Sequence, residues 1–331
     1  MKKIIIIEDK FNQRVDKFLS SFAKASADKK EEVFFNENIT RGEIIRQIRD
    51  DNILVNSKKI KPSYILKEND KIEINFDKKS EKLIPNKDIK FDVIYQDENI
   101  VVINKPAGIS VHPVKSDITS DHGASPNFTL VNGLLYQFPE IKNVGDDPEI
   151  RPGIVHRLDK DTSGIMVVAK NQKTFEELKK KFKNREVEKK YLAIVQGKLE
   201  NKTGVIEKPL ARSSDYKKQI VANKKTRTTI RPAATEYEVI KEFDDYSLVE
   251  VSPKTGRTHQ IRVHMTSIGH PIAGDKIYKL KNSNKKILAN RQMLHAKSIK
   301  FILFGKDYSF LAEFPEDFSN VLNFLTRLDN K

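Results

Sequence analysis

Apolar residues recur at helical spacing after a capping pattern near residue 40. Thr40 and Glu43 have the spacing of a capping box, which predicts that a helix begins there. Three isoleucines fall on one face of this helix, namely Ile44, Ile45 and Ile48. Three arginines fall off that face, namely Arg41, Arg46 and Arg49. The pattern predicts a helix with an apolar side and a basic side, which by itself is typical of an ordinary solvated surface.

The same region contains the other elements of a small α+β domain. An earlier helix is predicted at about 14–22, and short strands are predicted within 53–60 and 70–76. We therefore expect a first domain over residues 11–76. Small and charged residues without apolar periodicity predict an insertion at about 23–38, and the polar stretch 77–88 has the composition of a linker.

From residue 89 the pattern changes to many short strands and few helices. Runs rich in β-branched and aromatic residues predict strands at 91–96, 99–105, 165–170, 190–197, 235–243, 246–252 and 298–304. Helices are predicted at 129–138, 174–184 and 258–269, the last ending at Gly269 before Pro271. The fold class expected for residues 89–330 is α+β, with a mixed, mostly antiparallel sheet.

Charge and composition narrow the function classes. The chain has 331 residues, of which 61 are Lys or Arg and 46 are Asp or Glu, so its formal net charge is +15. This excess favours a polyanionic partner, with nucleic acid ahead of membrane. No apolar run approaches a membrane span, so we expect a cytoplasmic protein. The absence of Cys excludes disulfides, thiolate zinc sites, Fe–S clusters and cysteine nucleophiles.

The segment "DKDTSG", which starts at Asp159, has the acid spacing of a calcium loop. The twelfth loop position requires an acidic ligand but is Lys170, and residues 165–169 form an apolar run typical of a buried strand. These features exclude a calcium site. Asp161 to Gly164 instead favour a turn into that strand. The turn does not account for Asp159, which follows His156 and Arg157 closely.

Other common sites lack their defining features. His259 and His264 are five residues apart, so on a helix they point about 140° from each other and do not form an i, i+4 metal pair. The remaining histidines considered are expected to be structural, namely His112, His270 and His295. Motifs of serine hydrolases, P-loop proteins and dinucleotide-binding folds are absent. A polar motif at 254–264 and the Asp159 segment remain, and in a basic protein they suggest one cleft built from distant segments.

At these residues the chain resembles the RluA family of RNA pseudouridine synthases, of the large-subunit ribosomal RNA type. "RPGIVHRLDKDTSGIMVVAK" resembles the catalytic motif of that family, and "KKYLAIVQG" resembles its tyrosine motif. "NIVVINKPAGISVHP" resembles the opening strand and loop, and "TGRTHQIRVHM", "HPIAGDKIY" and "RQMLHAKSIKF" resemble the C-terminal motifs. The first domain resembles an S4 RNA-binding domain, although the connection at 23–38 is longer than usual in the family.

The resemblance implies an activity and a set of residues. It implies conversion of uridine to pseudouridine in large-subunit ribosomal RNA without a cofactor or metal. Asp159 would be the catalytic carboxylate, Arg262 its cationic partner, and Tyr191 the residue that stacks on uracil or moves a proton. Arg157 would fill the space left by a flipped nucleotide. The other expected RNA contacts are basic residues of the first domain, namely Arg41, Arg46, Arg49, Lys58 and Lys59.

Two other functions remain open at this point. In a noncatalytic RNA-binding protein the S4-like domain would dominate and the larger domain would be a chaperone or assembly platform. The presence of Asp159, Tyr191 and Arg262 together counts against this function. An RNA or nucleoside N-glycosylase would break the same bond and release free uracil. We expect a monomer with no membrane partner.

Overall fold

The computed structural model describes residues 2–7, 11–28, 41–49, 51–75, 83–113, 127–214, 218–280 and 289–329. The chain divides into two units, Met1–Ser80 and Glu81–Lys331. Each unit has its own buried hydrophobic core, as expected for two domains. Within the described residues, no helix is long and apolar enough to span a membrane.

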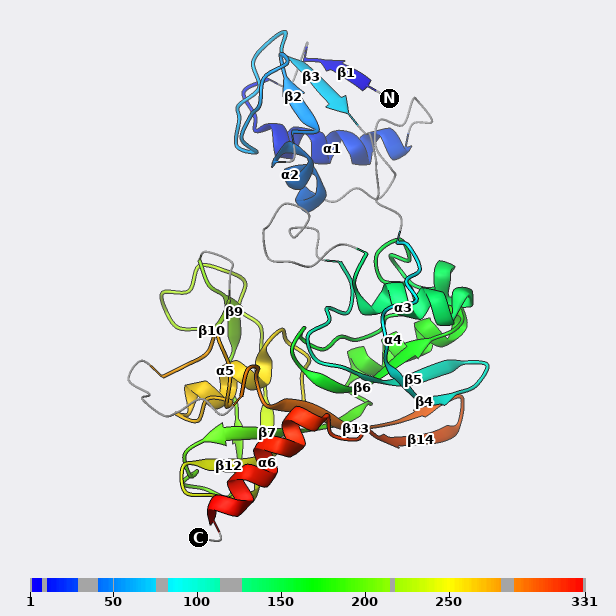
Figure 1. Cartoon of the computed structure of the whole chain (residues 1–331). Coiled ribbons are helices and arrows are strands. Elements are labelled where there is room, and N and C mark those ends of the chain that lie inside the picture. The colour runs from blue at the N-terminus through cyan, green and yellow to red at the C-terminus, as the bar shows by residue number, and fades with distance from the viewer. Residues whose placement is uncertain are drawn as a thin grey trace. The chain divides into compact units, whose positions relative to one another are not determined.

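The first unit packs two helices on a small antiparallel sheet (Figure 1). Its elements are β1 (Lys2–Ile6), α1 (Val15–Asp28), α2 (Arg41–Arg49), β2 (Ile53–Val55) and β3 (Lys71–Asn75). The strand order is β1-β3-β2, and both pairings are antiparallel. Ile44 and Ile48 of α2 are buried against Leu19 of α1 and Ile72 of β3 in one core. The helical face that the isoleucine spacing predicts is therefore buried, although Ile45 is only partly covered.

The limits of this unit differ from the sequence prediction. β1 precedes the expected start at Phe11 and pairs with β3 from Lys2 to Ile6. Helix α1 runs to Asp28, into the segment predicted as an insertion, while residues 29–40, and with them the expected cap Thr40, lie outside the described residues. The strand expected over 53–60 ends at Val55, because the next two residues turn the chain with positive φ.

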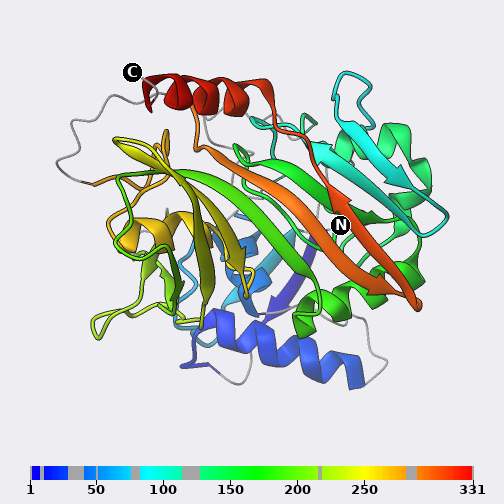
Figure 2. The ribbon, with the colours of Figure 1, turned by 90° about the horizontal axis from the view of Figure 1, so that it is seen from below.

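The second unit is built on a nine-stranded sheet (Figure 2). Its strands are β4 (Asp92–Gln96), β5 (Ile100–Lys105), β6 (Ser163–Ala169), β7 (Glu188–Gln196), β8 (Thr203–Ile206), β11 (Thr235–Glu242), β12 (Tyr246–Pro253), β13 (Leu294–Leu303) and β14 (Lys306–Leu311). The order is β4-β5-β6-β13-β7-β12-β11-β8, and β14 pairs with β13. Only β6 and β13 pair in parallel within this sheet. The mixed, mostly antiparallel sheet of an α+β fold is therefore confirmed.

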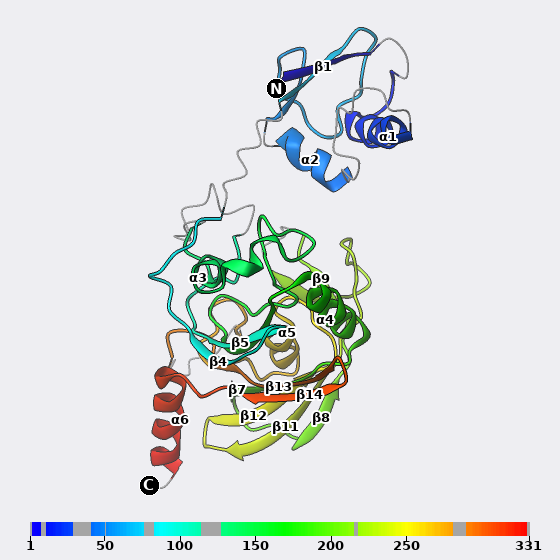
Figure 3. The ribbon, with the colours of Figure 1, turned by 90° about the vertical axis from the view of Figure 1, so that its right-hand side faces the viewer.

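Helices flank the sheet, and a short ribbon projects beside it. The helices are α3 (Leu130–Gln137), α4 (Gln172–Asn184), α5 (Gln260–Ser267) and α6 (Glu316–Asp329), with a 3₁₀ turn at Pro139–Asn143. Figure 3 shows α3, α4 and α5 on one side of the sheet. The ribbon consists of β9 (Leu210–Arg212) and β10 (Gln219–Val221) and packs against α5.

Two hydrophobic clusters meet in the middle of the sheet. One contains β5, β6, α3 and α4, and the other contains β7, β12, α5 and α6. Tyr191 of β7 packs against both clusters. In the strand register Tyr191 is opposite Ala296 of β13, and Ala296 is opposite Gly164 of β6. The segment before β6 and the tyrosine strand are therefore separated by a single strand.

Several elements differ from those predicted from the sequence. Strands β8, β9, β10 and β14 were not predicted, because short strands have weak local signals, and helix α6 was not predicted either. The described part of the expected linker, 83–88, is held on α3, where Asn132 Nδ2 donates to Ile84 O at 2.9 Å. The turn expected at Asp161 to Gly164 is shorter, because β6 already begins at Ser163.

Candidate active site

The loop carrying Asp159 is held by two buried basic side chains. The amine of Lys105, whose pKa burial lowers to about 7, donates to the carbonyl of Lys160 at 3.0 Å and to two carbonyls of its own loop. The guanidinium of Arg291 donates to the carbonyl of Asp161 at 3.0 Å. Both side chains are buried, so each hydrogen bond is protected from water. Two consecutive carbonyls directly after Asp159 are therefore fixed from behind the loop.

Gly164 allows the loop to enter the sheet. Its φ is +117°, and a Cβ there would overlap the Ala296 carbonyl oxygen and lie only 2.5 Å from the Ala296 nitrogen. Only glycine lets β6 approach β13 this closely with this backbone conformation. The parallel pairing of β6 and β13, and with it the position of Asp159, depends on this residue.

Arg262 lies between two carboxylates that come from different segments. Its Nη1 donates to Asp159 Oδ2 at 2.9 Å, and its Nε and Nη2 donate to the two oxygens of Asp275 at 2.7 and 3.0 Å. The Asp275 side chain is fully buried, and that of Arg262 is 4% exposed. Asp159 is 19% exposed and faces the cleft. The buried pair thus presents one guanidinium nitrogen to a carboxylate that can meet a ligand.

The electrostatic environment keeps this guanidinium charged. Burial acts to lower the pKa of Arg262, but hydrogen bonds and the charge of Asp275, followed by the charge of Asp159, raise it above its usual value. Arg262 also lies over the ring of Tyr278, with Cζ 5.0 Å from the ring centre. The cation is therefore available to Asp159 at any pH at which the protein is folded.

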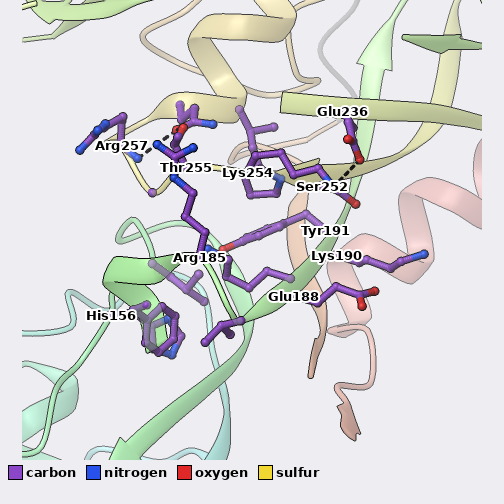
Figure 4. A pocket seen from close by; sticks show the side chains of 18 of the residues that line it. His156, Arg185, Glu188, Lys190, Tyr191, Glu236, Ser252, Lys254, Thr255 and Arg257 are labelled. Atoms are coloured by element: carbon purple, nitrogen blue, oxygen red, sulfur yellow. Dashed lines mark hydrogen bonds and ion pairs between the residues drawn. The ribbon is translucent and has the colours of Figure 1, made fainter. Parts of the chain in front are cut away.

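Tyr191 reaches the same cleft from β7. Burial raises the pKa of its phenol, and the negative charge of Asp159 raises it further. The hydroxyl is therefore protonated at neutral pH and offers a donor and a flat aromatic face. Figure 4 shows the ring crossing the pocket between Lys254 and Ser252 on one side and His156 on the other.

Arg157 and His156 precede Asp159 but point to different surroundings. Arg157 is exposed, and its Nη1 lies 3.1 Å from Nε2 of His112. His156 stacks on Phe182, with ring centres 4.6 Å apart, and its Nε2 accepts the backbone N–H of Val167 at 3.0 Å. Burial, together with the positive charge of Lys189, lowers the pKa of His156 to about 3. His156 is a neutral structural residue, whereas Arg157 is free to meet a ligand.

One cleft of about 1480 Å³ brings the predicted residues together. Asp159, Tyr191, Arg262 and Arg157 all line it, as the hypothesis of a single cleft built from distant segments requires. Its wall also includes the end of α4 and the turn before α5. The volume exceeds that of a single nucleotide pocket and suits a macromolecular ligand.

The basic residues expected to bind RNA in the first unit have different environments. Arg41 and Arg14 both contact the buried carboxylate of Asp16, the Arg41 bond measuring 2.7 Å. Arg49 is exposed, and the side chain of Arg46 is not among those described. Lys58 and Lys59 are exposed and line a hollow of about 450 Å³, where Lys59 also contacts Asp51. Arg41 therefore already has a structural partner.

The histidines have separate partners. His264 is buried on α5, where its two ring nitrogens contact Thr235 Oγ1 and Lys208 O. His270 contacts Gln196 O, and His295 contacts Ser163 Oγ. Across the described parts of the chain, no three acidic or histidine side chains gather as a metal site would require. His259 and His264 do not share a site.

Two family models match this chain. A family model described as RNA pseudouridylate synthase matches residues 99–267, and a model described as S4 domain matches residues 37–72. The chain belongs to the RNA pseudouridylate synthase family. The match covers the loop of Asp159, the strand of Tyr191 and the helix of Arg262.

Sequence similarity to relatives of this synthase covers most of the chain. Ribosomal large subunit pseudouridine synthase C of Buchnera aphidicola is 36% identical over 97% of this chain and 96% of its own length. Ribosomal large subunit pseudouridine synthase D of Borreliella burgdorferi is 39% identical over 78% of this chain and 77% of its own length. Among solved structures, human RNA Pseudouridylate Synthase Domain Containing 1 has a TM-score of 0.55 and 26% identity, covering 75% of this chain and 90% of that one.

Sequence reasoning missed four residues that build this site. Asp275 and Tyr278 both lie in the quoted motif "HPIAGDKIY", and Arg291 begins "RQMLHAKSIKF". Lys105 ends a strand that begins with four apolar residues, so a lysine there signals a buried or functional amine. Their roles could not be assigned from the sequence, because each acts on a segment that is distant along the chain.

Proposed function

We propose that this synthase isomerises specific uridines of large-subunit ribosomal RNA to pseudouridine. Two relatives with extensive coverage are named ribosomal large subunit pseudouridine synthases. The observation that carries the proposal is Asp159, a partly exposed carboxylate in a large cleft, held at 2.9 Å by an arginine that is itself anchored on buried Asp275.

In this reaction the bond between uracil N1 and ribose C1′ breaks, and a bond between C5 and C1′ forms. The C5 proton leaves to solvent and N1 gains a proton, so the base is retained and no electrons are exchanged with a cofactor. Positive charge develops on the sugar as the first bond breaks, and one ionised carboxylate can stabilise it or attack C1′. We assign this role to Asp159.

The other cleft residues would position the target nucleotide. Tyr191 offers its ring to the uracil, and because its phenol is protonated in the free protein it would start as a donor rather than a base. Exposed Arg157 would occupy the space that the flipped nucleotide leaves in its stack. Before RNA binds, the guanidinium of Arg157 contacts His112 at 3.1 Å.

The first unit would add affinity for the RNA backbone. The first unit, Met1–Ser80, would be the RNA-binding domain and the second, Glu81–Lys331, the catalytic domain of a monomer. Arg46, Arg49, Lys58 and Lys59 would neutralise phosphates, so binding would weaken steeply with salt. Arg41 would contribute less, because its guanidinium is shared with Asp16.

The first prediction tests the central assignment with Asp159→Asn. A large-subunit RNA transcript carrying tritium at uridine C5 is incubated with the wild type, with the variant, and with Asp307→Asn as an exposed control on β14. We expect tritium release by the wild type and the control, and a loss of at least about 10³-fold in Asp159→Asn, because the variant lacks the charge that meets the sugar. RNA binding, measured by filter retention, should be nearly unchanged.

The same assay separates the alternatives. A glycosylase would release labelled uracil, whereas an RNA-binding protein without activity would release neither tritium nor base. Activity retained in Asp159→Asn would refute the assignment of the catalytic carboxylate while leaving the isomerase activity itself in place.

A further inference from the structure

We propose that His259 is a positioning residue that holds Asp159 through its Oδ2 oxygen, together with Arg262, so that Oδ1 is the oxygen presented to the sugar. The inference rests on the proposed function and adds to it a residue and a choice of reactive atom. It follows from the contacts of His259, Arg262, Tyr278 and Asp275 around the start of α5.

Both donors near Asp159 face the same oxygen. Arg262 Nη1 lies 2.9 Å from Oδ2, and His259 Nε2 lies 3.8 Å from it. No other hydrogen bond from a described residue reaches the carboxylate of Asp159, and Oδ1 receives none. At 3.8 Å the imidazole is not yet hydrogen-bonded, but catalytic contacts in ligand-free proteins commonly shorten when the substrate closes the site.

A tyrosine sets which nitrogen of His259 carries the proton. Tyr278 Oη lies 2.8 Å from His259 Nδ1 and also accepts the backbone N–H of Gln219 at 3.0 Å. When the phenol donates its hydrogen to Nδ1, the ring proton is on Nε2 and faces the negative carboxylate. Burial lowers the pKa of His259, although the charge of Asp159 acts in the opposite direction, so the ring is neutral at pH 7 and has a single N–H.

Asp275 supports both Tyr278 and Arg262. Asp275 Oδ1 accepts the backbone N–H of Tyr278 at 3.0 Å while the carboxylate binds Arg262. The backbone of Tyr278, the residue that orients His259, and the guanidinium of Arg262 are therefore both held by Asp275. Both donors to Asp159 share one rigid support.

The backbone at His259 is in an uncommon conformation. His259 caps α5 with φ 54° and ψ 17°, in the left-handed region, which few residues other than glycine adopt although asparagine, aspartate and histidine are enriched there. This conformation directs the imidazole between Tyr278 and Asp159. Once the imidazole moves within hydrogen-bond distance, Oδ2 has two donors, and they fix the plane of the carboxylate because rotation about Cβ–Cγ would break both contacts.

The test compares His259→Gln with His259→Asn. The glutamine amide nitrogen reaches the position of Nε2 and keeps a donor for Asp159, whereas the asparagine amide replaces Nδ1 and keeps only the contact with Tyr278. Asparagine tolerates positive φ better than glutamine, so His259→Asn should be the more stable variant. If His259 acts on Asp159, activity follows the opposite order from stability.

Tritium release is measured at saturating RNA for both variants, with thermal unfolding measured in parallel. We expect kcat to fall about tenfold in His259→Asn, which corresponds to one lost hydrogen bond to a charged group, and about threefold or less in His259→Gln, with KM unchanged in both. Equal losses in the two variants, a loss confined to KM, or full activity in His259→Asn would overturn the inference. An inactive wild type would instead refute the proposed function.

Tyr278→Phe keeps the test decisive if either His259 variant fails to fold. It leaves His259 in place but removes the oxygen that orients its ring, so kcat should fall while RNA affinity is retained. Unchanged kcat in Tyr278→Phe would overturn the inference on its own.

Discussion

Asp275→Asn should destabilise the second unit although the side chain keeps its size. The asparagine oxygen can still accept one of the two Arg262 hydrogen bonds, which measure 2.7 and 3.0 Å, but its amide group opposes the other. It must also satisfy the backbone N–H groups of Ile277 and Tyr278, which donate to Asp275 Oδ1 at 2.9 and 3.0 Å. The guanidinium keeps Asp159 as its only carboxylate neighbour.

The magnitude follows from the burial of the pair. Removing one partner of a buried ion pair costs about 3–5 kcal/mol. Because Asp159 remains and the asparagine retains one acceptor, we expect the lower end, about 3 kcal/mol. For a unit of this size each kcal/mol lowers Tm by about 2–4 °C, so Tm should fall by about 6–12 °C.

Calorimetry and urea unfolding measure this change, and Asp307→Asn serves as the matched control because Asp307 is exposed on β14. The control should change the free energy of unfolding by no more than about 0.5 kcal/mol. If Asp275→Asn unfolds within 1 kcal/mol of the wild type, roughly the size of a surface effect, then Asp275 does not anchor Arg262 and the reasoning is refuted.

Two other predictions concern the supports of the site. Gly164→Ala should lower the free energy of unfolding by about 4 kcal/mol, from strain and overpacking together. The control Gly256→Ala, where a Cβ meets nothing within 4 Å, should be nearly neutral. Similar melting temperatures for the two variants would contradict this prediction. Burial lowers the pKa of His156 to about 3 in the folded protein. As the pH falls from about 6.5 towards 3, only the unfolded chain takes up a proton at this residue. The free energy of unfolding should therefore decrease by about 1.4 kcal/mol per pH unit. His156→Gln can still accept the Val167 N–H but should not show this decrease. Urea unfolding of the wild type and the variant at pH 6.5, 5.5 and 4.5 measures the difference. The same pH dependence of the free energy of unfolding in both proteins would contradict a buried neutral imidazole.

Local patterns were sufficient for the elements with strong periodicity. The isoleucine spacing of α2 and the apolar runs of β5 and β6 identify helix and strand correctly, because burial of one face leaves a regular signal. β1 and β14 were missed because edge strands expose apolar residues such as Ile4 and Leu311 and lose clear alternation. Helix α6 was not predicted, although its buried residues Phe318, Val321 and Leu325 have the i, i+3, i+7 spacing of an amphipathic helix.

The sequence alone determined the class of fold, the family and the candidate residues Asp159, Tyr191 and Arg262, because these lie in short motifs that can be read locally. Only the tertiary structure decided how they meet. Asp159 and Arg262 are 103 residues apart, and β13, which comes from later in the chain, lies between β6 and β7. Pairing between distant strands depends on the packing of the whole unit, so the anchor Asp275 and the orientation of His259 have no local signal.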